Sequence, residues 1–410
     1  MRCQRGVRSH MPKIDFSAYE GGREQAYIKH TLLEEYLPEW GYKVGSQWDS
    51  LVYVDGFAGP WDVQTPSFGD SSFGVAATAL SHVAEVLTER GKRLNVRCVL
   101  VEENQDAFAR LKMYAESVSR PGFRVDALGG QFVSQLPAIQ RIIREAGNSA
   151  FRFVFLDPKG WADIPMSEIR PLLNVRGSEV VVNLMTRFMI RFLEQEDRAE
   201  SFRGLFGRDE VLRILDETPA SEKHDAVVRE YCKSLHQLCG FKYVSSAIIL
   251  EPKRDDIRYF LVYGTNHHRG VEVFKASETK AARLQDQIRH EAAVQKSGGQ
   301  DNMMGALFGG EAPKSDYAFT LWQRYCAKAK RKVIERILAA PAQGVAFAEL
   351  FCDAMAFPLV TPTDLHGWLS QWHDAVELRL DGEKRKKPSP DHNDSVVLKD
   401  AVKLRSFVRS

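Results

Sequence analysis

The feature that most constrains the fold is the alternation of short β-rich runs with helical patterns between residues 50 and 184. Between the runs, apolar residues recur three or four positions apart, as on one face of a helix. This alternation is typical of a parallel sheet covered by helices on both faces. We therefore predict an α/β fold. Its predicted strands are 51–55, 97–102, 123–127, 151–157 and 179–184.

The pattern changes after a helical region over residues 188–238. Two further β-rich runs, 241–250 and 258–265, flank the charged turn EPKRDDI, which indicates an antiparallel hairpin and not another crossover. Five crossover strands followed by a terminal hairpin are typical of the Rossmann-like class I methyltransferase fold. A dehydrogenase usually continues with a sixth parallel strand.

A second, smaller domain is expected near the C-terminus. Residues 293–316 are rich in glycine and lack periodicity, which indicates a linker. Helical patterns then precede a two-stranded pattern over 375–400, an order that suggests a winged helix-turn-helix domain. The predicted organisation is an N-terminal tail over 1–22, a Rossmann-like domain over 23–292, a linker over 293–316 and a winged-helix domain over 317–410.

Composition narrows the class of protein but not its function. Hydrophobic residues make up 44% and charged residues 27%, ordinary values for a globular protein, and the net charge of +2 does not by itself indicate a nucleic-acid partner. No apolar run approaches the roughly 18 residues of a membrane span, and no signal peptide is recognisable, so we expect a cytoplasmic protein. The six cysteines are scattered, which predicts neither a metal cluster nor a disulfide framework.

The turn after the first predicted strand has the shape of a ligand cradle. It reads DGFAGP, and in doubly wound sheets ligands bind outside the carboxyl ends of the strands. Gly56 and Gly59 let the backbone approach a ligand closely. The spacing is not Gly-x-Gly-x-x-Gly, and Asp55 would repel a phosphate, so dinucleotides and triphosphates are disfavoured. Asp55, Gly56, Ala58 and Gly59 are predicted to hold S-adenosylmethionine, which offers an ammonium and a ribose; an ordinary turn is the alternative.

Acids also follow the next two predicted strands. Glu102 occupies a place where a carboxylate commonly binds ribose hydroxyls, whereas Glu103 better fits the first turn of a helix. Asp126 could accept a hydrogen bond from the adenine amino group, although alone it is more simply a turn residue. Acids at the ends of three successive strands together predict a nucleoside-cofactor pocket.

The fourth predicted strand ends in LDPKGW. Asp157 and Pro158 resemble the Asp-Pro-Pro-Tyr motif of enzymes that methylate exocyclic amines, in which a carboxyl group and a backbone carbonyl hold the amine while an aromatic ring stacks on the base. Lys159 replaces the second proline, so Trp161 would have to stack. The alternative is that Asp157 caps a turn and Trp161 lies in the core.

Several further residues are weaker candidates. Lys29 and His30 could contact a substrate or the cofactor carboxylate, or lie on a solvated helix face. Residues 187–191, with Arg187, Phe188 and Arg191, could reach the same cleft, but an amphipathic helix explains them equally well. The pair His267-His268 has no third ligand at metal spacing nearby and is interpreted as a turn. No metal site is predicted.

Taken in order, these motifs resemble the three-Cys-motif partner (TcmP) family. The matching stretches lie between residues 26 and 280 and are Lys29-His30, YVDGFAGP, VEEN, LDPKGW, VVNLMTRFMIRF, LFG and YGTNHHRGVEVFK. The C-terminal region is similar to the winged helix of members of this family. The resemblance implies a methyltransferase-like fold and a partner that carries a three-cysteine motif and looks like a radical-SAM protein. The pattern is also similar to large-subunit rRNA adenine-N6 methyltransferases, which implies an amino-nitrogen target. Lys159 and the GDSSFG step depart from these families.

The resulting hypothesis is an S-adenosylmethionine-dependent methyltransferase acting on an amino nitrogen of a base in DNA or RNA, with catalysis mainly by alignment. The basic run 384–387 would contact phosphates or form a solvated loop. One alternative is a non-catalytic adaptor that docks the three-cysteine partner. Another, weaker because its acids would be spread over separate strand ends, is a metal-dependent nuclease using Asp55, Glu102 and Asp157.

Overall fold

The computed structural model describes residues 16–19, 22–59, 63, 65, 68–147, 150–193, 195, 198–296, 317–382 and 385–408. The start of the predicted tail, most of the predicted linker, Pro60 and Lys384 lie outside the described residues. The chain divides into two compact units, 1–155 and 156–410. The strand order of the main sheet is β3-β2-β1-β4-β5-β7-β6. None of the described helices has the length and apolar character needed to cross a bilayer.

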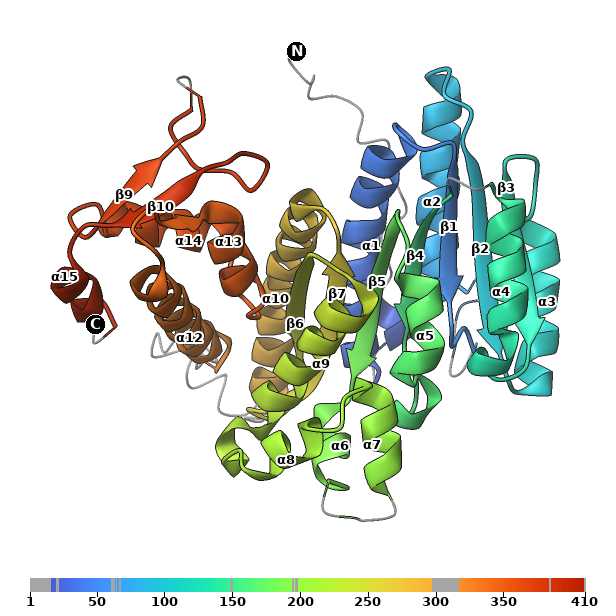
Figure 1. Ribbon diagram of the computed structural model, residues 1–410. Coiled ribbons are helices and arrows are strands. Elements are labelled where there is room, and N and C mark those ends of the chain that lie inside the picture. Colours follow the sequence, from blue (N-terminus) through green and yellow to red (C-terminus); the bar gives the residue numbers. More distant parts are fainter. Residues whose placement is uncertain are drawn as a thin grey trace, which may run out of the picture. The chain divides into compact units, whose positions relative to one another are not determined.

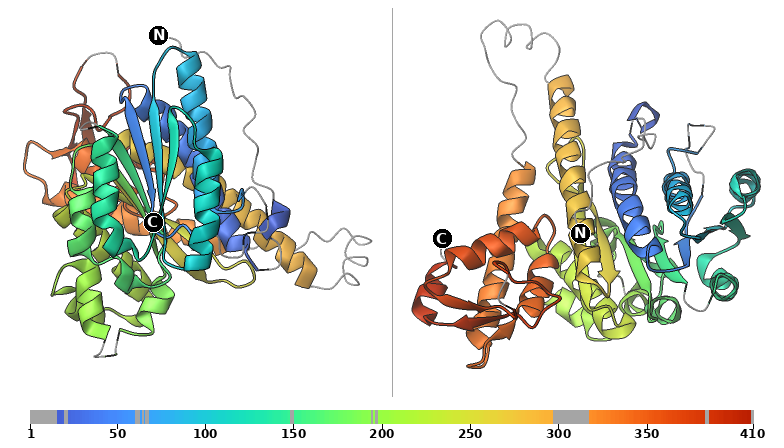
Figure 2. Two further views of the ribbon diagram at one scale, coloured as in Figure 1. Left: turned by 90° about the vertical axis from the view of Figure 1, so that its right-hand side faces the viewer. Right: turned by 90° about the horizontal axis from the view of Figure 1, so that it is seen from above.

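The first unit alternates helices and parallel strands (Figure 1). Strand β1 pairs in parallel with β2 and β4, and β2 pairs in parallel with β3. Helices lie on both faces of these strands (Figure 2). The elements are α1 (Glu24–Gly45), β1 (Ser50–Asp55), α2 (Ser72–Glu89), β2 (Asn95–Glu102), α3 (Gln105–Val118), β3 (Phe123–Gly129), α4 (Phe132–Glu145) and β4 (Phe151–Leu156).

Local sequence explains where these helices begin. Strand β1 is buried along its whole length, as its continuous apolar run requires in a sheet covered on both faces. The Ser71 hydroxyl caps α2 by accepting a hydrogen bond from the Gly74 N–H, and the Asn104 side chain caps α3 in the same way through the Ala107 N–H. Helices α2 and α3 therefore start on the carboxyl side of β1 and β2, where a ligand edge is expected.

The second unit begins with a short 3₁₀ turn and crossover helices and continues into an antiparallel hairpin. Strand β7 pairs antiparallel with both β5 and β6. The predicted crossover strands, terminal hairpin and Rossmann-like fold class are confirmed by this strand order. The elements are α5 (Met166–Leu173), β5 (Ser178–Leu184), α6 (Thr186–Ile190), α7 (Ala199–Phe206), α8 (Val211–Asp216), α9 (Lys223–Cys239), β6 (Tyr243–Leu250), β7 (Ile257–Thr265) and α10 (His268–Lys296).

The C-terminal part of this unit forms a small helical segment with its own sheet. Strand β10 pairs antiparallel with β8 and β9. Helix α14 begins with a reciprocal capping box between Thr361 and Asp364 and with Pro362 in its first turn. The elements are α12 (Tyr317–Ala339), β8 (Val345–Ala346), α13 (Phe347–Met355), α14 (Pro362–Gln371), β9 (Val376–Arg379), β10 (Ser395–Leu398) and α15 (Ala401–Ser406). Residues 293–296 of the predicted linker are helical, as the end of α10.

A buried ion pair fixes this C-terminal segment against α10. Lys275 and Glu278 are almost fully buried and 2.9 Å apart. Lys275 Nζ also donates to the Phe357 carbonyl at 2.6 Å, and Glu278 accepts the Leu359 N–H at 2.9 Å. Burial lowers the pKa of Lys275 and raises that of Glu278. Because each charge finds several partners, the pair is satisfied in the core.

Candidate active site

Asp55, the last residue of β1, organises the turn that follows. Its carboxylate is fully buried and accepts the Phe57 N–H at 3.1 Å on Oδ1. On Oδ2 it accepts the hydroxyls of Ser72, at 2.7 Å, and Tyr53, at 3.3 Å. The carboxylate therefore holds the turn and the start of α2 in place. Asp55 thus supports the predicted ligand cradle through hydrogen bonds to the turn and to the start of α2.

The backbone of the turn crosses the carboxyl edge of the sheet. The Gly56 N–H donates to the Phe155 carbonyl at 3.0 Å, and the Ala58 N–H donates to the Val101 carbonyl at 2.8 Å. The turn thus bridges β4 and β2, with Ala58 buried and Gly59 partly exposed. Backbone laid over the strand ends in this way suits a ligand that packs against main-chain atoms.

Glu102 ends β2 at the same edge. Its side chain is buried, and Oε1 accepts the Asn104 N–H at 2.6 Å. Its carbonyl accepts the Gly130 N–H at 2.9 Å, which ties the loops after β2 and β3 together. In register, Asp55 lies opposite Leu100, so Glu102 extends two residues beyond the level of Asp55. The structure therefore brings Asp55 and Glu102 to one edge, as predicted.

Asp126 does not lie at the end of its strand, and that prediction is wrong. Strand β3 continues to Gly129, and Asp126 pairs in register with Val99, within β2. Both of its carboxylate oxygens bind Arg97, at 2.9 and 3.2 Å. This bidentate pair with a strand neighbour occupies Asp126. The strand ends at Gly129, three residues beyond Asp126.

His30 is a core residue, although the sequence predicted either a contact to substrate or cofactor or a solvated helix face. It is 5% exposed on α1, and its Nδ1 lies 2.8 Å from the Tyr19 hydroxyl. Burial, and then the neighbouring Lys29 charge, hold the pKa of His30 well below its ordinary value. The ring is therefore neutral at pH 7. Lys29, on the same helix, is only partly exposed.

Asp157 directly follows β4 and is paired with a residue that sequence reasoning missed. Asn183, in β5, donates from Nδ2 to Asp157 Oδ1 at 2.5 Å. Asn183 is 5% exposed, and its Oδ1 has no hydrogen-bond partner among the described residues. Exchanging the amide atoms would set oxygen against carboxylate oxygen, so the orientation is fixed. The signal was the single amide within the buried run VVVNL.

A small cavity adjoins this pair in the second unit. It has a volume of about 10 Å³, room for roughly one water molecule, and Asn183, Pro158, Gly160, Trp161 and Phe188 are among its lining residues. Asn183, whose Oδ1 has no partner among the described residues, is one of the residues of this lining. A buried acceptor without a partner is costly, so this oxygen marks a place where a hydrogen-bond donor is needed.

Trp161 is packed in the core, which was the alternative to its predicted role in stacking on a base. It is 8% exposed and stacks on Phe202, with ring centroids 4.7 Å apart. Its indole N–H donates to the Ser201 hydroxyl at 3.0 Å. The exposed aromatic ring beside it is Phe188, which is 42% exposed and 5.6 Å from Trp161. Phe188 is the most exposed aromatic side chain among the described residues of this cluster, which also contains the partly exposed Phe192.

The basic neighbours of Phe188 differ in their surroundings. Arg187 is bound by two carboxylates, at 3.0 Å from Asp256 and 3.6 Å from Glu251. Its charge is therefore largely neutralised within the second unit. Arg191 is exposed. Of the two predicted arginines, Arg187 is the one held by carboxylates of the second unit.

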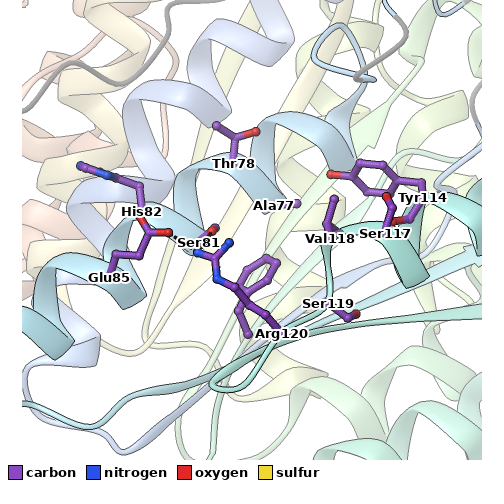
Figure 3. Close-up of a pocket in the computed structure, with 11 residues that line it drawn as sticks. Ala77, Thr78, Ser81, His82, Glu85, Tyr114, Ser117, Val118, Ser119 and Arg120 are labelled. Atoms are coloured by element: carbon purple, nitrogen blue, oxygen red, sulfur yellow. Dashed lines mark hydrogen bonds and ion pairs between the residues drawn. The ribbon is translucent and has the colours of Figure 1, made fainter.

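A larger cavity, about 530 Å³, lies between α2 and α3 in the first unit (Figure 3). Phe123, the first residue of β3, lines it, so it is at the amino ends of the strands, away from the cradle. Arg120 reaches across it to Ser81 at 2.6 Å and pairs with Glu85. Its charged groups are thus paired with one another, and it contains none of the predicted site residues.

No protein-family model and no curated protein matches the chain. The solved structures that match the chain include the following two. A provisionally assigned caffeoyl-CoA O-methyltransferase from Staphylococcus aureus is 10% identical, with a TM-score of 0.27, and the match covers 60% of this chain and 84% of that one. A provisionally assigned methyltransferase from Porphyromonas gingivalis W83 is 12% identical, with a TM-score of 0.25, and the match covers 64% of this chain and 53% of that one. At these TM-scores the fold rests on the strand order.

Proposed function

We propose that the protein is an S-adenosylmethionine-dependent methyltransferase acting on an exocyclic amino group of a nucleic-acid base. The observation that carries this proposal is the pair of acceptors formed by Asp157, after β4, and Asn183, in β5. Asp157 is held by Asn183 at 2.5 Å, and Asn183 Oδ1 is left without a partner. An amino group has two N–H donors, and two acceptors placed together can hold both. Its lone pair is then free to face a methyl donor.

The residues at the edge of the first unit fit the cofactor only in part. Glu102 offers a carboxylate at the strand end for the ribose hydroxyls, and the backbone of Gly56, Ala58 and Gly59 offers a close packing surface. Asp55 supports this surface through its own hydrogen bonds, and Asp126 takes no part. The cofactor, when bound, supplies the methyl group as an electrophile.

The residues near Asp157 would act mainly by positioning the amine. The Asp157 carboxylate, the Pro158 carbonyl and Asn183 Oδ1 would accept its N–H groups, while Phe188 would stack on the base in place of the predicted Trp161. Methylation leaves the nitrogen with a surplus proton. The Asp157 carboxylate is a base within hydrogen-bond reach to receive it.

The C-terminal segment would supply further contacts to nucleic acid. Its order of helix, strand, two helices and two strands, with a sheet in the order β8-β10-β9, supports our interpretation as a winged helix. Arg385 is not available to phosphates, because it binds the buried Asp394. Lys386 and Lys387 would carry the phosphate contacts. We also propose that the chain belongs to the TcmP family and acts with a partner that carries a three-cysteine motif.

One observation favours the adaptor as a second candidate. The cavity beside Asp157 holds about one water molecule, and Trp161 packs firmly against Phe202. A base can enter only if Phe188 and its neighbours move aside. If they do not, the sheet is a scaffold that docks a partner, and no methyl transfer follows.

The test is transfer of tritiated methyl groups from S-adenosylmethionine to ribosomal RNA and to single- and double-stranded DNA. We expect label in one of these nucleic acids, at least about 100-fold less with Asp157→Asn, and wild-type rates with Asp163→Asn, which changes an exposed acid nearby. Cofactor binding should survive Asp157→Asn. If the wild-type protein binds the cofactor but labels no nucleic acid, with or without its partner, the adaptor is the function that remains.

A further inference from the structure

Three metal-ligand side chains come together between the end of β7 and the loop that joins β9 to β10. His267 and His268 follow β7, and Asp391 lies in the loop, far away in sequence. Each offers one ligand atom, and these atoms lie within 4.8 Å of one another. We propose that His267, His268 and Asp391 bind a divalent transition-metal cation of the zinc class. This site is independent of the proposed methyl transfer.

The surroundings of His268 point to a cation. Its side chain is 6% exposed, Nδ1 lies 3.1 Å from Asp391 Oδ1, and Nε2 lies 3.8 Å from Glu272 Oε1. Both ring nitrogens thus face carboxylate oxygens. A neutral imidazole has only one N–H, so one nitrogen turns a lone pair toward a carboxylate unless a second proton or a metal ion occupies it. A cation bound by Nδ1 and Asp391 removes this repulsion.

The donor set fits zinc better than calcium or magnesium. Two imidazoles and one carboxylate are nitrogen and oxygen ligands that zinc accepts, whereas calcium and magnesium require mostly oxygen. Ligand atoms around a tetrahedral zinc lie roughly 3.3 Å apart, close to the 3.1 Å between His268 Nδ1 and Asp391 Oδ1. Glu272 Oε1 lies 3.8 Å from Nε2, where a carboxylate commonly stands behind a metal-bound histidine, and a small shift would let it accept the remaining N–H of His268.

Two contacts of neighbouring residues must be compatible with the cation. Arg269 lies 3.6 Å from Asp391 Oδ2, the oxygen that does not face His268, so Oδ1 remains for the metal. His267 Nδ1 accepts the Arg269 backbone N–H at 3.2 Å. Because the His267 ring is exposed, it can release this contact and turn toward the metal without disturbing the core. Water would complete the coordination.

The experiment is calorimetric titration of full-length, EDTA-treated and desalted protein with ZnCl2, with CoCl2 titrated in parallel to read ligand geometry from its visible absorption. We expect one equivalent bound with micromolar affinity. His267→Ala removes an exposed ring, and Asp391→Asn changes a partly exposed side chain, so both should fold and should weaken binding at least tenfold. The matched control is His373→Ala, which changes an exposed histidine 3.5 Å from Asp374 and should bind like wild type.

The result that would overturn the proposal is wild-type affinity in His267→Ala and Asp391→Asn, or no binding by the wild type below about 1 mM. Thermal unfolding gives a second readout. Zinc at 100 µM should raise the Tm of the wild type by several degrees and leave that of His267→Ala unchanged, because only the native state assembles the three ligands. A Tm rise of equal size in both proteins would also contradict the site.

Discussion

Asn183 donates a 2.5 Å hydrogen bond to the Asp157 carboxylate while its own buried Oδ1 has no partner among the described residues. If this oxygen holds the target amine, Asn183→Leu should lower the methyl-transfer rate at least about tenfold, one hydrogen bond of roughly 1.5 kcal/mol. Cofactor affinity should not change. The control is Asn174→Leu, an exposed asparagine outside the site. Equal rates in both variants would remove Asn183 from the site.

Asp55 should matter more for stability than for direct ligand contact. Asp55→Ala leaves the Phe57 N–H and the Tyr53 and Ser72 hydroxyls without their acceptor, so we expect a loss of about 3 kcal/mol in the free energy of unfolding. Ser72→Ala removes only one donor and should cost about 1 kcal/mol. Urea unfolding measures both. A smaller loss in Asp55→Ala than in Ser72→Ala would refute this role.

His30 should make the protein sensitive to acid. Its folded-state pKa lies well below the ordinary 6.5, so between the two values the unfolded chain binds a proton that the native state does not. Its contribution to stability is complete above about pH 6.5 and is lost as pH falls, by up to about 1.4 kcal/mol per pH unit.

Replacing the His30 ring should therefore flatten the pH dependence of the free energy of unfolding. His30→Gln should show a shallower fall in unfolding free energy between pH 6.5 and 5 than the wild type, measured by urea unfolding at each pH. His373→Ala, which changes a mostly exposed ring, should keep the wild-type slope. Parallel curves for His30→Gln and the wild type would show that His30 titrates normally.

Most of the fold was predictable because buried parallel strands are continuous apolar runs and their helices carry local caps. Helix α10 was not predicted as a long helix. It is rich in charged residues, and the burial of Lys275 and Glu278 depends on partners at Phe357 and Leu359 that no local pattern reveals. The predicted linker started inside this helix for the same reason.

Site residues could be predicted only where the sequence also indicated the end of their strand. Asp55 and Glu102 end their strands, so the edge could be inferred. The end of β3 was predicted too early, near Asp126, because the sequence Ala-Leu-Gly that follows gives no indication that pairing with β2 continues to Gly129. Trp161 was misjudged because the distant Phe202 covers its ring. The His267, His268 and Asp391 cluster depends on tertiary structure alone.

In the basic run 385–387, between β9 and β10, we expect one residue to stabilise the fold and two to bind nucleic acid. Arg385 binds Asp394, and hydrogen bonds from this guanidinium lower the pKa of the Asp394 carboxyl to about 2. Arg385→Ala should lower the stability, because it leaves the buried Asp394 carboxylate without its guanidinium partner. Lys386→Ala with Lys387→Ala should leave stability unchanged.

The same variants should differ in binding to nucleic acid. If both lysines contact phosphates, the double variant should reduce the slope of log affinity against log salt by about 2 on a DNA duplex. Fluorescence anisotropy over a series of salt concentrations measures this slope. An unchanged slope would show that these lysines lie in a solvated loop.

The central claim is that the edge formed by β1 and β2 binds S-adenosylmethionine. Calorimetry of the purified protein with S-adenosylmethionine and S-adenosylhomocysteine tests it most directly, comparing wild type with Glu102→Gln and with the exposed neighbour variant Glu103→Gln. We predict micromolar binding, about 8 kcal/mol, weakened at least tenfold in Glu102→Gln alone. Absence of binding by the wild type, or equal affinity in Glu102→Gln and Glu103→Gln, would contradict it.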